Sequence, residues 1–157
     1  MRRGRLFIMT ATSIIVAGLF FFFFISFYYR ADYVTGTIIS QEVKRLAGIL
    51  NTINKQCAIL GFDNQQNPIN FLTVGSFQGS EVGPMNLKYP EKWAGPYVKD
   101  NPTMQGKEFM VVKTEDGYFV TPGNGVRLPN GKIIGKDIVL DIKANIEELI
   151  RDNTLIF

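Results

Sequence analysis

The 157-residue sequence contains no histidine and only one cysteine, Cys57. Histidine is the commonest general base and a frequent zinc ligand, so its absence excludes Ser-His and Cys-His nucleophile pairs and histidine-ligated zinc. A lone cysteine forms no disulfide within the chain, which must be stabilised by its core, by assembly or by an ion. We therefore expect no enzyme, no catalytic residue and no cofactor.

Acidic residues are absent from the first 31 positions, and residues 6–29 carry no charged side chain. At about 1.5 Å per helical residue this run can cross a hydrocarbon core of roughly 30 Å, which predicts a transmembrane helix. Arg2, Arg3 and Arg5 precede it, and the positive-inside rule places such an N-terminus in the cytoplasm. The predicted parts are a cytoplasmic N-terminus (1–5), a transmembrane helix (6–29) and an extracytoplasmic domain (30–157).

The positive charge is concentrated at the N-terminus. The net charge is +3, but four of the 17 basic residues occupy positions 2, 3, 5 and 30, and all 14 acidic residues follow them. Residues 31–157 therefore carry 13 basic and 14 acidic side chains, a net charge of −1. A nearly neutral domain gives no reason to expect a nucleic-acid partner.

Residues 41–61 have the pattern of an amphipathic helix. Apolar side chains recur there at steps of three and four residues: Val43, Leu46, Ala47, Leu50, Ile53, Cys57 and Leu60. No proline separates this segment from the apolar run before it, so the sequence predicts one helix over about residues 5–60. Its apolar face is expected to pack on the structure formed by the C-terminal half.

The C-terminal half predicts a small antiparallel sheet. Apolar segments at 107–113 and 117–121 are joined by a turn with Asp116-Gly117, which is typical of a hairpin. A second hairpin is expected around Asn130-Gly131, in a type I′ turn.

Residues 62–101 show no sustained period and are expected to form a compact loop on the helix, and residues 141–152 a short helix. The predicted fold class is α+β, with a long N-terminal transmembrane and amphipathic helix packed on a small antiparallel sheet.

The segment KWAGPYVKDNP at 92–102 carries the most distinctive motif. Trp93, Gly95, Pro96, Tyr97 and Val98 match, in order and spacing, the W-x-G-P-Y stretch of major type II secretion pseudopilins. Glycine permits close approach and proline fixes φ, so we expect the motif to fasten the loop to sheet and helix around a large indole. An exposed aromatic patch for a partner is the alternative.

The chain thus resembles the pseudopilins of the type IV pilin superfamily over about residues 40–138. The resemblance implies a subunit whose N-terminal helix packs with other copies, and with other pseudopilins or inner-membrane components, in a periplasmic filament that supports protein export. It also implies a single-pass protein in the lipid bilayer of a bacterial inner membrane, with its C-terminal domain in the periplasm. We predict assembly contacts at small residues of the helix: Thr10, Ser13, Ala17 and Gly18.

One departure from the family favours a different function. Met9 stands where prepilins carry a glutamate, five positions after the leader glycine, here Gly4. The alternative is a membrane-anchored extracytoplasmic binding module that shares the fold but does not polymerise. The amphipathic continuation of the apolar run favours the filament subunit.

The family also binds calcium in a loop next to the sheet. Thr121, Asn124 and Asp137 fall near those places, but only one of them is charged. Calcium prefers about six or more oxygen ligands, including several carboxylates. We therefore interpret these residues as ordinary turn residues and predict no metal site.

Overall fold

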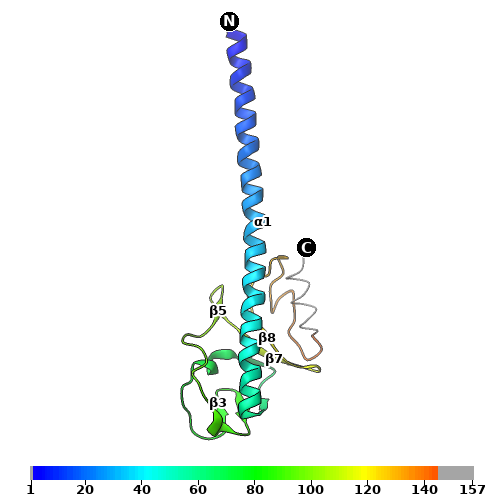
Figure 1. Cartoon of the computed structure of the whole chain (residues 1–157). Helices are drawn as coiled ribbons and strands as arrows, with labels where there is room; N and C mark the ends of the chain where they lie inside the picture. Colours follow the sequence, from blue (N-terminus) through cyan, green and yellow to red (C-terminus); the bar gives the residue numbers. More distant parts are fainter. Residues whose placement is uncertain (1, 145–157) are drawn as a thin grey trace. The chain divides into compact units, whose positions relative to one another are not determined.

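The computed structural model describes the backbone of residues 2–144, with side chains described for 13–26 and 36–144 (Figure 1). The chain divides into two units, Met1–Thr35 and Gly36–Phe157. Residues 142 and 143 form a turn in place of the start of the helix predicted for 141–152, and the rest of that predicted helix lies outside the described residues.

One α-helix, α1, runs from Arg2 to Cys57 and comprises 56 residues (Figure 1). The prediction of a single helix over about residues 5–60 is confirmed. The helix belongs to both units, beginning in the first and ending in the second.

The predicted transmembrane helix over 6–29 requires correction. Among the residues that the structure describes, no helix is long and apolar enough to cross a membrane. The transmembrane part of the predicted fold class and the single-pass inner-membrane localisation are therefore wrong for the described residues.

Helix α1 ends where the backbone enters a left-handed conformation at Ala58, with φ of 52°. The Asn54 carbonyl accepts a hydrogen bond from the Ala58 amide (3.0 Å), and the Asn54 side chain accepts one from the Ile59 amide (3.0 Å). The amide of Tyr89 donates to the carbonyl of Cys57 at 2.8 Å. These bonds satisfy backbone groups that the end of a helix leaves without partners.

The described residues of the second unit, 36–144, form three small antiparallel sheets instead of the single sheet that the sequence predicts. The first consists of β1 (Ile59–Phe62), β4 (Met85–Leu87) and β3 (Glu81–Val82), in that order. The second consists of β2 (Gln66–Pro68), β7 (Met110–Thr114) and β8 (Gly117–Thr121), and the third of β5 (Thr103–Met104) and β6 (Lys107–Glu108). Two short 3₁₀ helices, η1 (Ile69–Thr73) and η2 (Pro90–Lys92), complete the α+β fold. The region 62–101, predicted as a loop, therefore contains strands and 3₁₀ turns.

Strands β7 and β8 form the hairpin that the sequence predicts. Thr114 pairs with Gly117, so Glu115 and Asp116 form the two-residue turn, one position earlier than expected. Gly117 has φ of 130°, a conformation that side-chain-bearing residues rarely adopt.

The second predicted hairpin is reduced to an isolated bridge between Arg127 and Ile133. The Gly131 amide donates to the carbonyl of Leu128 at 2.9 Å, and the Leu128 amide donates to the carbonyl of Lys132 at 2.8 Å. Pro129 and Asn130 are thus the central residues of the turn, so the predicted type I′ turn at Asn130-Gly131 is wrong. A type I turn followed by a left-handed glycine gives this three-residue loop.

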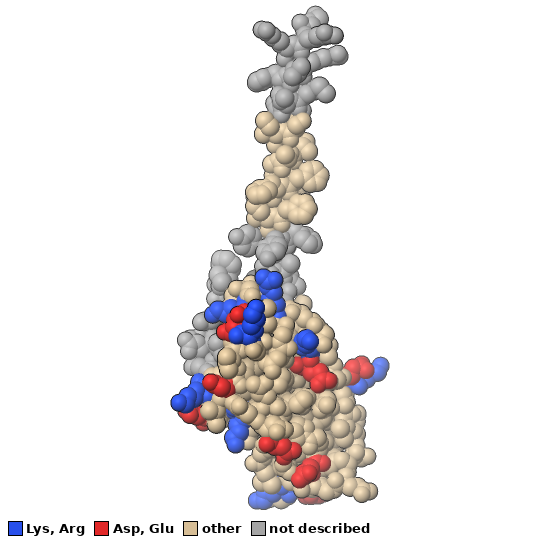
Figure 2. All heavy atoms as spheres, turned by 180° about the vertical axis from the view of Figure 1, so that it is seen from behind, with Lys and Arg blue, Asp and Glu red and all other residues tan. Residues whose placement is uncertain are grey.

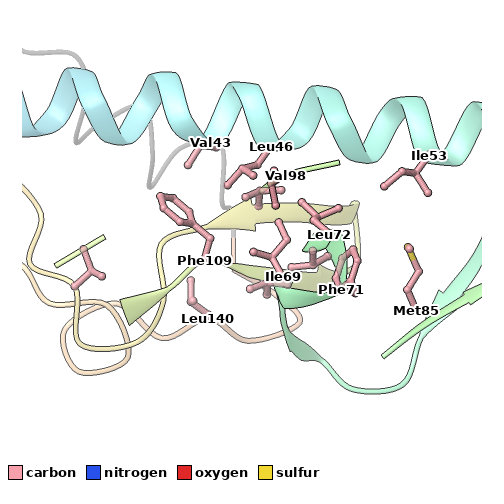
Figure 3. Packing of buried hydrophobic residues seen from close by; sticks show 14 of the residues in the cluster. Val43, Leu46, Ile53, Ile69, Phe71, Leu72, Met85, Val98, Phe109 and Leu140 are labelled. Carbon is pink, nitrogen blue, oxygen red and sulfur yellow. The ribbon is translucent and has the colours of Figure 1, made fainter. Parts of the chain in front are cut away.

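The hydrophobic core lies between α1 and the sheets of the second unit. Val43, Leu46 and Ile53 point from α1 toward Phe71 and the neighbouring strands (Figure 3). Leu46 and Ile53 have no exposed surface.

Two members of the predicted helical face do not belong to this core. Ala47 is exposed, and Leu60 lies on β1, outside the helix, with 67% of its surface exposed. The apolar period therefore predicted the buried positions Val43, Leu46 and Ile53 correctly, but it also included two exposed residues.

Candidate functional site

The most unusual surface of the described chain is a run of exposed apolar side chains on α1. Its large members are 41% to 75% exposed: Ile14, Ile15, Val16, Leu19, Phe20, Phe21, Phe22, Phe23, Phe24 and Ile25. The face drawn in Figure 2 has no Lys, Arg, Asp or Glu in this stretch, and the sequence has none at 13–26. We call residues 13–26 the apolar segment.

The apolar segment is apolar on every side of the helix. Successive residues of an α-helix are about 100° apart, so the five consecutive side chains Phe20 to Phe24 point around the full circumference. An amphipathic surface helix has instead one apolar stripe and a polar opposite face. A helix that is apolar all round is usually buried, which makes this segment a candidate surface for assembly.

The predicted small-residue contacts lie in or next to the apolar segment. Ala17 and Gly18 are exposed, and a Cβ atom added at Gly18 would meet nothing within 4 Å. Ser13 and Ala17 are four residues apart and share a helix face. The side chain of Thr10 lies outside the described residues. Small side chains let two helices approach closely, so Ala17 and Gly18 offer a shallow position between bulky neighbours.

The second candidate feature is the aromatic clamp, formed by Trp93, Gly95, Pro96 and Tyr97. The indole N–H of Trp93 donates to the carbonyl of Val74 at 3.1 Å. The ring meets Phe77 edge-on at a centroid distance of 5.5 Å and Tyr97 at 4.9 Å. Trp93 is half-buried and packs against the core, as the predicted packing role requires.

Gly95 is the residue that permits this packing. A Cβ atom there would lie 2.5 Å from Nε1 of Trp93 and 2.5 Å from the carbonyl oxygen of Val74. Contacts below 3.0 Å do not occur for real Cβ atoms, so any other residue would separate the hydrogen-bonded pair. The Gly95-Pro96 peptide bond is cis.

Tyr97 connects the clamp to η1 and to α1. Its amide donates to the carbonyl of Leu72 at 2.9 Å. Its hydroxyl donates to Oε1 of Gln56 on α1 at 3.4 Å and accepts from the amide of Ala94 at 3.3 Å. The clamp thus holds the segment after η2 against the C-terminal part of α1.

Thr121, Asn124 and Asp137, the residues considered above as calcium ligands, all form hydrogen bonds. The amide of Ile133 donates to Oδ2 of Asp137 at 2.9 Å, and the side-chain amide of Asn124 donates to that of Gln66 at 3.0 Å. The Thr121 hydroxyl donates to the carbonyl of Pro122 at 2.9 Å. Within the described part of the chain, no three residues of His, Cys, Asp or Glu gather as a metal site would require.

Sequence reasoning missed a third feature, which we call the lysine–tyrosine patch: Lys88, Tyr89 and Lys92. The Lys92 and Lys88 ammonium nitrogens lie 4.4 Å and 5.3 Å from the centroid of the Tyr89 ring. The signal in the sequence is KYPEK, where two lysines bracket an aromatic residue at close spacing.

No family model, curated protein or solved structure matches the chain.

Proposed function

We propose that this chain is a pseudopilin-like subunit that assembles with other copies of itself through the apolar segment of α1, in a filament that supports protein export. The observation that carries the proposal is the exposure of large apolar side chains on consecutive positions of the helix. Soluble monomers rarely expose a contiguous apolar surface of this kind, and such surfaces usually mark interaction sites.

The distribution of these side chains favours a many-helix assembly over a dimer. A two-stranded coiled coil covers one stripe of each helix, at two positions in seven. Phe20 to Phe24 point in all directions, so one partner helix would leave most of these rings in water. Several helices around each α1 would cover the whole circumference.

Sedimentation of the full-length chain after dilution from detergent tests the proposal. We expect large assemblies whose fraction rises with protein concentration. The double variant Phe21→Gln/Phe23→Gln should shift the chain toward monomers, because both rings are about 70% exposed in the single chain and would be covered in the assembly.

Val139→Gln is the matched control, because Val139 is 65% exposed but lies outside α1. This variant should assemble like the wild type. A wild-type chain that stays monomeric at every concentration would contradict the proposal and favour a binding module that does not polymerise.

A further inference from the structure

The lysine–tyrosine patch gathers two positive charges that have no carboxylate partner among the described residues. Among the described residues, the ion pair with a nitrogen–oxygen distance of at most 4.0 Å is the one between Arg45 and Glu42. Both of these residues lie on α1, outside the patch. Glu91, which lies between the lysines in sequence, is exposed and forms no such pair with Lys88 or Lys92. No carboxylate of the described residues therefore competes with an outside anion for these two ammonium groups.

The backbone that carries the patch is fixed at the end of α1. The Lys88 amide donates to the carbonyl of Ala58 at 2.9 Å, and the Tyr89 amide donates to that of Cys57 at 2.8 Å. The Lys92 amide donates to the carbonyl of Tyr89 at 3.2 Å within η2. Tyr89 remains 37% exposed, and tyrosine is enriched where proteins bind one another.

The same chain carries a surface of opposite charge, the acidic turn formed by Glu115 and Asp116 between β7 and β8. Both side chains are exposed and form no ion pair with the described residues. The turn is held in place because the Glu115 amide donates to the carbonyl of Ile142 at 2.8 Å and the Asp116 amide donates to the Thr114 hydroxyl at 3.2 Å.

We propose that the lysine–tyrosine patch of one copy binds the acidic turn of a neighbouring copy. Two adjacent carboxylates face two adjacent ammonium groups in this contact, and the exposed Tyr89 ring packs against the hairpin. The inference rests on the proposed function, because it requires copies that the apolar segment has already brought together.

The contact joins two different surfaces, so a bound pair of copies keeps one free patch on one copy and one free turn on the other. Heterologous contacts of this type produce open chains unless the rotation closes a ring. Exposed ion pairs are individually weak and are screened by salt. The contact therefore fixes the orientation of neighbours, while the apolar segment supplies the main stabilisation.

Charge reversal on each side tests the contact, with the full-length chain and sedimentation as the measurement. Lys88→Glu/Lys92→Glu and Glu115→Lys/Asp116→Lys should each raise the concentration needed for assembly by about five- to tenfold, the size expected for two lost exposed pairs. The quadruple variant restores opposite charges and should return to within about threefold of the wild type. Lys132→Glu/Lys136→Glu reverses two exposed lysines elsewhere and should leave assembly unchanged.

The outcomes separate this inference from the proposed function. A wild type that assembles, with both double variants matching the lysine control, overturns the contact and leaves assembly through α1 standing. Double variants that weaken assembly without rescue in the quadruple variant overturn it as well, because restoring opposite charges on the two surfaces then restores no contact between them. Failure of the wild type to assemble overturns both.

Discussion

The indole N–H of Trp93 donates a hydrogen bond to the carbonyl oxygen of Val74 at 3.1 Å, across 19 residues of sequence. This bond joins the segment after η1 to the segment after η2. Phe77 and Tyr97 pack against the same indole ring edge-on. The aromatic clamp therefore combines ring packing around the indole with a hydrogen bond from the indole itself.

Substitution of Trp93 should separate the packing of the ring from its hydrogen bond. Trp93→Phe keeps an aromatic ring but leaves the Val74 carbonyl without its donor, so we expect a loss of about 1 to 2 kcal/mol in the free energy of unfolding. Trp93→Ala removes the ring as well and should cost about 3 kcal/mol, the low end for tryptophan because the side chain is half-buried. Urea unfolding of both variants gives the two values, and equal losses would contradict the separate contribution of the ring.

Two glycine substitutions should change stability in opposite directions. Gly95→Ala places a methyl group 2.5 Å from both Nε1 of Trp93 and the Val74 carbonyl oxygen, so it should destabilise the fold by more than about 2 kcal/mol. Gly48→Ala adds a methyl group to an exposed helix position with nothing within 4 Å, and should stabilise it by about 1 kcal/mol. If both variants raise the melting temperature, the predicted steric conflict at Gly95 is wrong; if both lower it, the predicted gain at Gly48 is wrong.

The long helix could be predicted because its buried apolar residues recur in the sequence at steps of three and four residues. Val43, Leu46 and Ile53 face the core as their spacing indicates. The end of the helix could not, since it depends on Ala58 in a left-handed conformation and on an amide from Tyr89, far along the chain. The predicted end near residue 60 is therefore later than the observed end at Cys57.

The strands between 59 and 108 could not be predicted for a related reason. They are two to four residues long, which is too short for an alternating pattern to emerge. β1 exists because it pairs with β4, and this pairing joins segments that are distant in sequence. The clamp was predictable in its residue types, whereas its partners Val74 and Phe77 were not, because no local pattern connects them to Trp93.

The ion pair between Glu42 and Arg45 should make stability depend weakly on pH. Nε of Arg45 donates to the Glu42 carboxylate at 2.9 Å, and this hydrogen bond lowers the pKa of Glu42 from its ordinary value of 4.5. Because the folded pKa lies below the unfolded one, the stabilisation is present above about pH 4.5 and is lost as the pH falls. We expect about 0.3 to 0.5 kcal/mol, as for other exposed helical pairs.

Urea unfolding between pH 3 and pH 6, spanning roughly the carboxylate range, measures this dependence. Arg45→Gln should flatten it, whereas Lys44→Gln, at the neighbouring exposed position, should not. An unchanged pH dependence in Arg45→Gln would show that the pair contributes nothing measurable.

Cys57 should react slowly with alkylating reagents. Its side chain has no exposed surface, and burial raises the pKa of the thiol, which leaves less of the reactive thiolate. Because the folded pKa is the higher one, stability should also fall as the pH rises above the unfolded thiol pKa. The rate with iodoacetamide should rise by orders of magnitude in urea. A cysteine at exposed Thr52, in a Cys57→Ala background, is the control and should react rapidly without denaturant.

Asp137 should matter as a turn residue and not as a calcium ligand. Its Oδ2 accepts a hydrogen bond from the Ile133 amide at 2.9 Å, so Asp137→Ala should cost about 1 to 2 kcal/mol of stability. Asp137→Asn keeps an acceptor at this place and should cost less than about half of that.

Calcium titration distinguishes the two roles of Asp137. A turn residue requires no metal, so millimolar calcium and chelation should leave the melting temperature of the wild type unchanged. A calcium ligand would behave differently, because binding to the folded state alone raises the melting temperature with calcium concentration. Asp137→Asn would then lose most of that rise, since removal of the single carboxylate among Thr121, Asn124 and Asp137 would leave neutral oxygens alone at the site.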